Sequence, residues 1–172
     1  MGQSRTTTES QTNESKKLRD LIKDVRIAML TTVDAEGKLR SRPLATIEVE
    51  GQHEGDLLFF VRQESGKVDE IRKDNQVNVA YADPGGNTYV SVSGAASVGR
   101  DPALAKKHWS PMLQAWFEGP EDPSLAVLTV RLEKAEYWDG PGSWVARAIA
   151  LGKAALGDHD AKIGDHGTVG SN

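Results

Sequence analysis

Segments rich in apolar and β-branched residues recur along the middle of the chain, and each has the length of a strand. Residues 76–82 and 88–99 alternate apolar with polar positions, as strands with one buried face do. Residues 57–61, LLFFV, are continuously apolar and predict a strand buried on both faces. The predicted strands cover residues 26–33, the middle of 39–51, 57–61, 76–82, 88–99 and 125–139.

Helices are predicted where apolar residues recur at intervals of three or four positions. Residues 14–25 and 65–74 each form one apolar face in this way. Asp101 followed by Pro102 is a typical helix start, because the carboxylate can cap the helix and proline suits its first turn. Pro111 then divides the following helical segment into two pieces.

Six short strands joined by turns, with few helices between them, favour a mainly β fold, an antiparallel barrel that is closed or partly closed. Residues 15–140 are predicted to form this domain, and residues 141–157 a C-terminal amphipathic helix. Residues 1–14 and 158–172 have no apolar period and are predicted to be disordered, because they cannot offset the entropy of being ordered.

Composition limits the classes of function. The 21 basic and 25 acidic residues give a net charge of −4, which offers no general attraction for nucleic acid but leaves room for a local basic pocket. The absence of cysteine excludes disulfides, thiolate metal sites and a cysteine nucleophile, and the four histidines show no metal-binding spacing. No signal peptide or membrane-spanning run is present, so we expect a cytoplasmic protein that binds neither metal nor membrane.

The first candidate for chemistry is the stretch RSRPL within a predicted strand. Alternation places Arg40 and Arg42 on one face, about 6.5–7 Å apart along the strand, and their guanidinium groups suit phosphate oxygens. Pro43 lacks an amide hydrogen, so it fits an edge or a bulge where a ligand approaches the backbone. The alternative is a solvent-facing edge strand whose arginines pair with Glu48 or Glu50.

A second candidate follows the apolar strand, at Ser65-Gly66-Lys67. Ser65 is predicted to cap a helix whose free amides, with Lys67 nearby, would bind an anion. The alternative is an ordinary cap beside a solvated lysine.

The tryptophans are a third candidate, because four are many beside three phenylalanines and three tyrosines. Trp109 and Trp116 are seven residues apart and would form a flat wall for a planar ring such as a flavin. The alternative is ordinary packing. Nothing in the sequence resembles a catalytic triad or a pair of catalytic carboxylates, so any chemistry would come from a bound cofactor.

Four segments follow one another in a characteristic order and spacing: MLTTVDAEGKLRSRPL, LLFFVRQESGKVDEIRKDNQVNVAYAD, YVSVSGAASVGRD and LAVLTVRLEKAEYWDGPG. Together they resemble the flavin-binding split-barrel family, the superfamily of pyridoxamine 5′-phosphate oxidase, and within it the bacterial general stress protein branch. The resemblance spans roughly residues 16–156. It implies a six-stranded antiparallel split barrel and a homodimer with FMN, or alternatively FAD, at the subunit interface.

The resemblance also implies roles for individual residues. Arg42, with Arg40 beside it, would face the phosphate side of the flavin, and Ser65 and Lys67 match a phosphate-binding Ser-x-Lys pair. The remaining matches, along the flavin ring, are Ser41, Pro43, Leu44, Phe60, Val61 and Trp116.

Two departures from the family pattern bear on activity. Gly66 stands where the oxidases tend to have arginine, and their C-terminal arginine and histidine pattern is missing, so pyridoxamine-phosphate oxidation is not expected. The sequence leaves three functions open: an oxidoreductase that reduces bound flavin with NAD(P)H, a non-catalytic flavin carrier or stress sensor, and a protein-binding adaptor. Haem and deazaflavin also remain open as ligands, because related barrels bind them.

Overall fold

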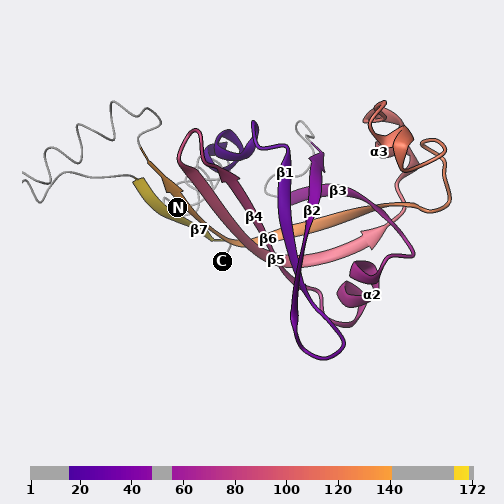
Figure 1. The fold of residues 1–172 in the computed structure, drawn as a ribbon, viewed down its shortest axis with the longest axis horizontal. Helices are drawn as coiled ribbons and strands as arrows, with labels where there is room; N and C mark the ends of the chain where they lie inside the picture. Colours follow the sequence, from indigo (N-terminus) through magenta and orange to yellow (C-terminus); the bar gives the residue numbers. More distant parts are fainter. Residues whose placement is uncertain (1–15, 48–55, 141–164, 171–172) are drawn as a thin grey trace, which may run out of the picture.

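The structure is a computed structural model that describes residues 16–47, 56–140 and 165–170 (Figure 1). Within these ranges one sheet contains β1 (Ile27–Val33), β2 (Leu39–Ile47), β3 (Asp56–Arg62), β4 (Gln76–Asp83), β5 (Thr88–Gly99), β6 (Leu125–Asp139) and β7 (Asp165–Gly170). The helical elements are residues 16–22, α2 (Gly66–Lys73), α3 (Pro102–Lys107) and the short 3-10 helix η1 (Leu113–Ala115).

The sheet closes into a barrel because β3 pairs at both of its edges. The strand order is β3-β2-β1-β4-β5-β6-β7, and β3 also pairs with β6, so six antiparallel strands form a closed ring. Residues 125–131 of β6 pair with β3, and residues 134–139 extend beyond the ring to pair with β7. The mainly β, six-stranded split barrel predicted from the sequence is therefore confirmed.

A bulge marks the point where β6 changes partner. The pairing of β5 with β6 shifts between Ser93, which lies opposite Lys134, and Gly94, which lies opposite Leu132. A Cβ atom at Gly94 would lie 2.1 Å from the carbonyl oxygen of Arg131, so only glycine allows the two strands to approach this closely. The bulge bends the long strands, as bulges at the rims of barrels do.

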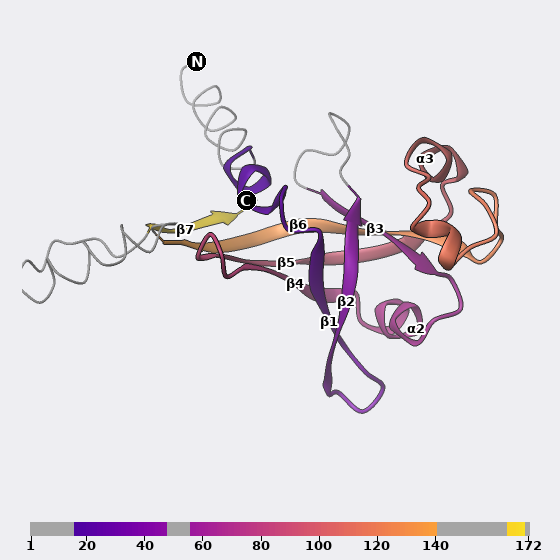
Figure 2. The same cartoon turned by 45° about the horizontal axis from the view of Figure 1, so that its top comes forward.

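The barrel interior holds the main hydrophobic core. Alternate residues of the strands, among them Leu30, Phe59 and Val79, are buried there with almost no exposed surface. Residues 16–22 and α2 add buried aliphatic side chains to the same core. They lie at opposite ends of the barrel in both views (Figures 1 and 2). Burial of these apolar surfaces supplies most of the driving force for the fold.

A smaller cluster lies outside the barrel, over one end of β3 and β6. Ala105, Phe117 and Leu125 are buried in it, and its partly buried members are Phe60, Trp109 and Leu113. The cluster holds the segment between β5 and β6 against the barrel. This segment starts as predicted, because the Asp101 carboxylate caps α3 by accepting a hydrogen bond from the Leu104 amide at 2.9 Å.

The two tryptophans of this segment do not share one helical face, contrary to their spacing in the sequence. The helix α3 ends at Lys107, before either tryptophan, and η1 ends at Ala115, just before Trp116. Trp109 packs against the small cluster, whereas the Trp116 side chain is 63% exposed. Pro111 separates the two helical pieces as predicted, and this break removes the regular seven-residue spacing.

The end of the chain also differs from its prediction. Residues 158–172 were expected to be disordered, yet residues 165–170 form β7 along the free part of β6. The ring of His166 stacks on Trp138, with 5.2 Å between ring centroids, and Gly167 lies against the ring of Tyr137. An unpaired strand edge accepts backbone hydrogen bonds from a segment of almost any composition, so the absence of apolar periodicity did not preclude a strand.

Some predictions fall outside the described residues, namely the disordered arm at residues 1–14 and the amphipathic helix at residues 141–157. Among the residues that are described, no helix combines the length and the apolar character needed to cross a membrane.

Candidate functional site

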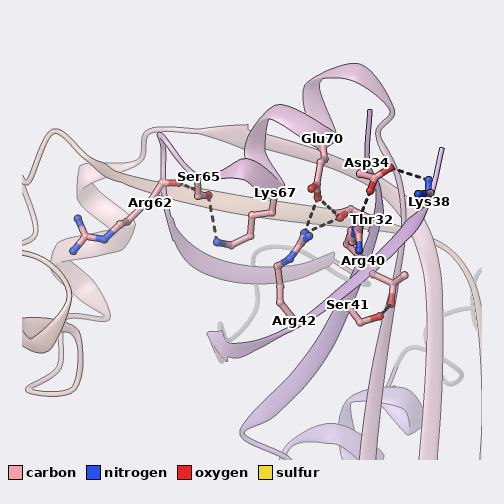
Figure 3. A network of polar contacts seen from close by, with 11 residues as sticks. Thr32, Asp34, Lys38, Arg40, Ser41, Arg42, Arg62, Ser65, Lys67 and Glu70 are labelled. Atoms are coloured by element: carbon pink, nitrogen blue, oxygen red, sulfur yellow. Dashed lines mark hydrogen bonds and ion pairs between the residues drawn. The ribbon is translucent and has the colours of Figure 1, made fainter. Parts of the chain in front are cut away.

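The candidate site forms where β2 meets the start of α2. The register of β1 and β2 places Arg42 opposite Leu30 and Arg40 opposite Thr32, so both arginines share the face of the barrel interior. Near this end of the barrel the interior is closed by α2 rather than by further strands (Figure 1). Arg42 therefore extends toward side chains of α2 (Figure 3).

Arg42 contacts Glu70 and Thr32 in a compact polar group (Figure 3). Its Nη1 atom donates hydrogen bonds to Glu70 Oε2 at 2.9 Å and to Thr32 Oγ1 at 2.7 Å. The Thr32 hydroxyl in turn donates to the same Glu70 oxygen at 2.5 Å. Thr32 is 1% exposed, so this group anchors Arg42 to the wall of the barrel.

Glu70 is held in its ionised form. Its partial burial opposes ionisation, but the Thr32 hydroxyl and the Arg42 guanidinium outweigh this effect and keep the pKa of Glu70 below its usual value. A carboxylate held as an anion between these partners is poorly placed to transfer protons at neutral pH.

Lys67 brings a second positive charge to the same place. Its Nζ atom donates to Ser65 Oγ at 3.2 Å (Figure 3). Burial and the nearby charge of Arg42 lower the pKa of Lys67, and Glu70 opposes this shift. Two cations thus share a partly dehydrated region with one carboxylate, an arrangement that a bound anion would stabilise.

The start of α2 completes the group. Ser65 occupies the N-cap position, but its side chain does not cap the helix and donates instead to the Arg62 carbonyl at 2.8 Å. The first amides of a helix have no partner within the helix, and they attract anions. A Cβ atom at Gly66 would meet no atom within 4 Å, so there is open space beside the first residue of α2.

Arg62 connects this helix start to the segment that carries Trp116. Its Nη2 atom donates to the Trp116 carbonyl, and its guanidinium lies over the Phe117 ring at 5.4 Å from the centroid. Ser65 binds the backbone of the same arginine. The exposed Trp116 is therefore tied to the strand end that precedes Ser65.

The structure brings together some of the residues singled out in the sequence and separates others. Arg42, Ser65 and Lys67 converge, with Trp116 linked to them through Arg62. Arg40 pairs instead with Asp34 in the β1–β2 turn, with 2.7 Å between Nε and Oδ2.

The remaining strand residues point in several directions. Ser41 and Pro43 lie on the outer face, where the Ser41 hydroxyl is 2.6 Å from that of Thr31. Leu44 packs against the main core, and Val61 is buried within it. Phe60, its neighbour on the opposite face of β3, joins the small outer cluster.

Sequence reasoning missed Thr32, Arg62 and Glu70. Glu70 carried a usable signal, because it lies three positions after Lys67 and therefore on the same side of a helix. Thr32 and Arg62 carried none, because only the strand pairing and the position of the α3–η1 segment give them their contacts.

Comparisons with known proteins agree with this architecture. A model of the pyridoxamine 5′-phosphate oxidase-like family matches residues 13–161. Protein bli-3 of Neurospora crassa is 36% identical over 146 residues, which cover 76% of this chain and 69% of that protein. General stress protein 26 of Bacillus subtilis is 30% identical over 128 residues, which cover 72% of this chain and 87% of that protein.

A solved structure from Nostoc punctiforme has the same fold. That protein is described as a pyridoxamine 5′-phosphate oxidase-related, FMN binding protein, and it matches with a TM-score of 0.57 and 14% identity. The match covers 81% of this chain and 86% of that one. Because the family model spans most of the sequence and the barrel has the expected topology, this chain belongs to the pyridoxamine 5′-phosphate oxidase-like family.

Proposed function

We propose that this chain is a flavin-binding protein of the general stress protein type, which holds FMN through its phosphate, with FAD as the alternative cofactor. The observation that carries the proposal is the position of Lys67, whose ammonium group lies partly dehydrated near Arg42 at the start of α2. A phosphate placed there would neutralise the excess positive charge and accept hydrogen bonds from the first helix amides.

The family supports the same ligand class. The Nostoc punctiforme protein with this fold is described as FMN binding, and the Bacillus subtilis relative is a general stress protein. The residues of this chain fit such a cofactor, because two cations and a serine hydroxyl lie beside an open helix start. Trp116, tied to the same region through Arg62, offers an exposed aromatic surface for a planar ring.

A bound flavin would supply the redox chemistry, with a nicotinamide such as NADPH as the hydride donor of an oxidoreductase. The chain itself would bind and orient the cofactor. Glu70 is occupied by Arg42 and Thr32 and stays ionised, so it offers no proton-transfer group of its own. This observation favours a second candidate function, a non-catalytic flavin carrier or sensor.

We also propose that the chain forms a homodimer. The outer face of β1 and β2 carries exposed apolar side chains, namely Ile27, Met29, Leu39 and Pro43. Leu39 is 72% exposed, which is unusual for a large aliphatic residue within a strand. A second copy of the chain would cover this surface, as the resemblance to the family implies.

The deciding experiment is the visible absorption spectrum of the purified protein, with chromatographic identification of any extracted cofactor. We expect a flavin spectrum and either FMN or FAD in the extract. In a titration of the cofactor-free protein, FMN should bind more tightly than riboflavin, because riboflavin lacks the phosphate. A colourless protein that binds neither compound would overturn the proposal. Consumption of NADPH by the flavin-loaded protein would then decide between oxidoreductase and carrier.

A further inference from the structure

Apart from tyrosines, Thr32 is the one buried polar residue in the part of the chain that the structure describes, with 1% of its surface exposed. It lies on the interior face of β1, two positions after Leu30, which pairs with Arg42 of β2. Side chains two positions apart share one face of a strand, so Thr32 is the diagonal neighbour of Arg42. A hydroxyl buried in a barrel wall costs free energy unless it is hydrogen-bonded, so the partners of Thr32 account for its presence there.

The Thr32 hydroxyl bridges the two charges beside it (Figure 3). It accepts a hydrogen bond from Arg42 Nη1 at 2.7 Å and donates one to Glu70 Oε2 at 2.5 Å. A hydroxyl can accept from a cation and donate to an anion at the same time, which neither charged partner can do. Thr32 therefore joins a guanidinium from β2 to a carboxylate from α2.

Glu70 by itself gives Arg42 only one point of attachment. The structure shows a single contact between them, from Nη1 to Oε2 at 2.9 Å, and not the two parallel hydrogen bonds of a bidentate pair. A guanidinium held at one point can still rotate about that contact. The second point is the Thr32 hydroxyl, which belongs to the barrel wall and to a β-branched side chain with little rotational freedom.

Arg42 also has hydrogen-bond donors that the barrel does not use. Both of its contacts are made by Nη1, and Nε and Nη2 have no hydrogen-bond partner within residues 16–47, 56–140 and 165–170. These two nitrogens form an edge of the guanidinium that can donate two parallel hydrogen bonds to the oxygens of a phosphate. The direction of this edge depends on how Nη1 is held.

We propose that Thr32 is a positioning residue of the phosphate site: it acts through Arg42, whose guanidinium it holds in the orientation that presents Nε and Nη2 to the phosphate. The inference rests on the flavin-binding function proposed above and explains how one of its two cations is ordered. Thr32 itself does not contact the phosphate. An arginine that is ordered before the ligand arrives loses less conformational entropy on binding, so the affinity rises without an added contact.

Thr32→Val tests the inference, because valine keeps the size and the β-branched shape of threonine and lacks only the hydroxyl. Thr32→Ser is the conservative variant that keeps the hydroxyl. The matched control is Thr46→Val, four residues after Arg42 on β2, where the hydroxyl lies 3.0 Å from that of the buried Tyr81 and not at the site. FMN and riboflavin should be titrated against the three variants and the wild type, with melting temperatures as a check on folding.

We expect Thr32→Val to weaken FMN about three- to tenfold and to leave riboflavin within about twofold, because riboflavin has no phosphate for Arg42 to bind. Thr32→Ser should bind FMN within about twofold of the wild type, since the bridging hydroxyl remains. Thr46→Val should lose stability and keep the wild-type preference for FMN. An unchanged FMN affinity in Thr32→Val, or equal losses for both ligands, would overturn the inference.

A double-mutant cycle tests whether Thr32 acts through Arg42. In the Arg42→Ala background, Thr32→Val should not weaken FMN further, because the group that Thr32 positions is absent. The same loss in both backgrounds would contradict the inference. If Thr32→Val does not fold, Thr32→Ala replaces it in both experiments, with the same selective loss of FMN expected.

The same titrations separate this inference from the proposed function. If the wild type binds riboflavin as tightly as FMN, the phosphate site is absent and the proposed function fails first. If the wild type prefers FMN and Thr32→Val keeps that preference in full, only the positioning role of Thr32 is overturned.

Discussion

At the scale of single residues, two arginines on the same face of β2 have different partners and therefore different roles. Arg40, whose side chain is 54% exposed, pairs with Asp34 in the β1–β2 turn. Arg42, two residues later, is partly buried and held by Glu70 and by the buried Thr32. The phosphate-binding role implied for both arginines therefore suits Arg42 better than Arg40.

The first prediction concerns the two cations of the site. Lys67→Ala and Arg42→Ala should each weaken FMN more than riboflavin, because both side chains are proposed to contact the phosphate. Loss of one charge-assisted contact should cost about 1.5–3 kcal/mol, or roughly ten- to a hundredfold in affinity. Titrations with both ligands measure this, and Arg40→Ala is the control. Equal losses for FMN and riboflavin would place Lys67 and Arg42 away from the phosphate.

A second prediction follows from the lowered pKa of Glu70. A carboxyl group whose pKa is lower in the folded state stabilises the protein above its unfolded pKa, and this stabilisation is lost as the pH falls through the folded pKa. Burial opposes the shift, but Thr32 and Arg42 produce a net lowering for Glu70. The stability of the wild type relative to Glu70→Gln should therefore fall between about pH 5 and about pH 3. Urea denaturation at several pH values measures this difference, and a constant difference would argue against the shift.

At the scale of elements, the bulge between β5 and β6 gives the barrel its split shape. The register shift at Gly94 lies where β6 leaves β3; beyond this point β6 stays paired with β5 and pairs with β7 along its other edge. Without the close contact between Gly94 and the Arg131 backbone, the two long strands could not bend together at this point.

The third prediction is that Gly94→Ala destabilises the fold by about 2 kcal/mol or more, because the new Cβ would force the strands apart. Gly99→Ala is a matched control in the same strand, because a Cβ there meets nothing within 4 Å. It should be neutral or slightly stabilising. Denaturant unfolding of both variants measures the difference, and equal stabilities would show that the strands can separate at little cost.

At the scale of the whole molecule, the candidate site and the C-terminal strand lie at opposite ends of the barrel. Figures 1 and 2 both place α2 at one end and β7, with residues 16–22, at the other. Lys17 donates to the Tyr137 hydroxyl at 2.8 Å, so the helical residues 16–22 and β6 are joined at the end away from the site.

The fourth prediction uses this separation. Truncation after Gly157 removes β7 and exposes the edge of β6 and more of Trp138. The melting temperature should fall by a few degrees, or about 1 kcal/mol, while the affinity for flavin stays the same. Calorimetry and flavin titration on the same protein measure both quantities. Loss of flavin binding would show that the tail belongs to the site.

The fifth prediction tests the proposed dimer. Leu39→Asp places a charge on the apolar outer face of β1 and β2 and should shift the protein toward monomer in sedimentation experiments at micromolar concentration. Ser97→Asp adds the same charge at an exposed position of β5 and should leave the assembly unchanged. A wild-type protein that sediments only as a monomer would contradict the proposal outright.

The sequence by itself determined the six strands of the barrel, their approximate ends and the barrel class. Strands with one buried face must alternate, so residues such as Val77, Val79 and Tyr81 predicted both the strand and its buried side. The helix start at Asp101 was equally predictable from the sequence, because its cap depends only on residues close to one another in the chain. Both features depend on residues that are neighbours in the chain, so they can be predicted without knowing which distant segments pack against them.

Only the tertiary structure decided which charged groups meet. Arg42 and Glu70 are 28 residues apart, and closure of the barrel, not local sequence, brings α2 over β2. The same holds for β7, whose order depends on the free edge of β6 rather than on its own composition. Contacts between distant segments arise from the packing of whole elements, and a pattern read along one segment cannot specify its partner.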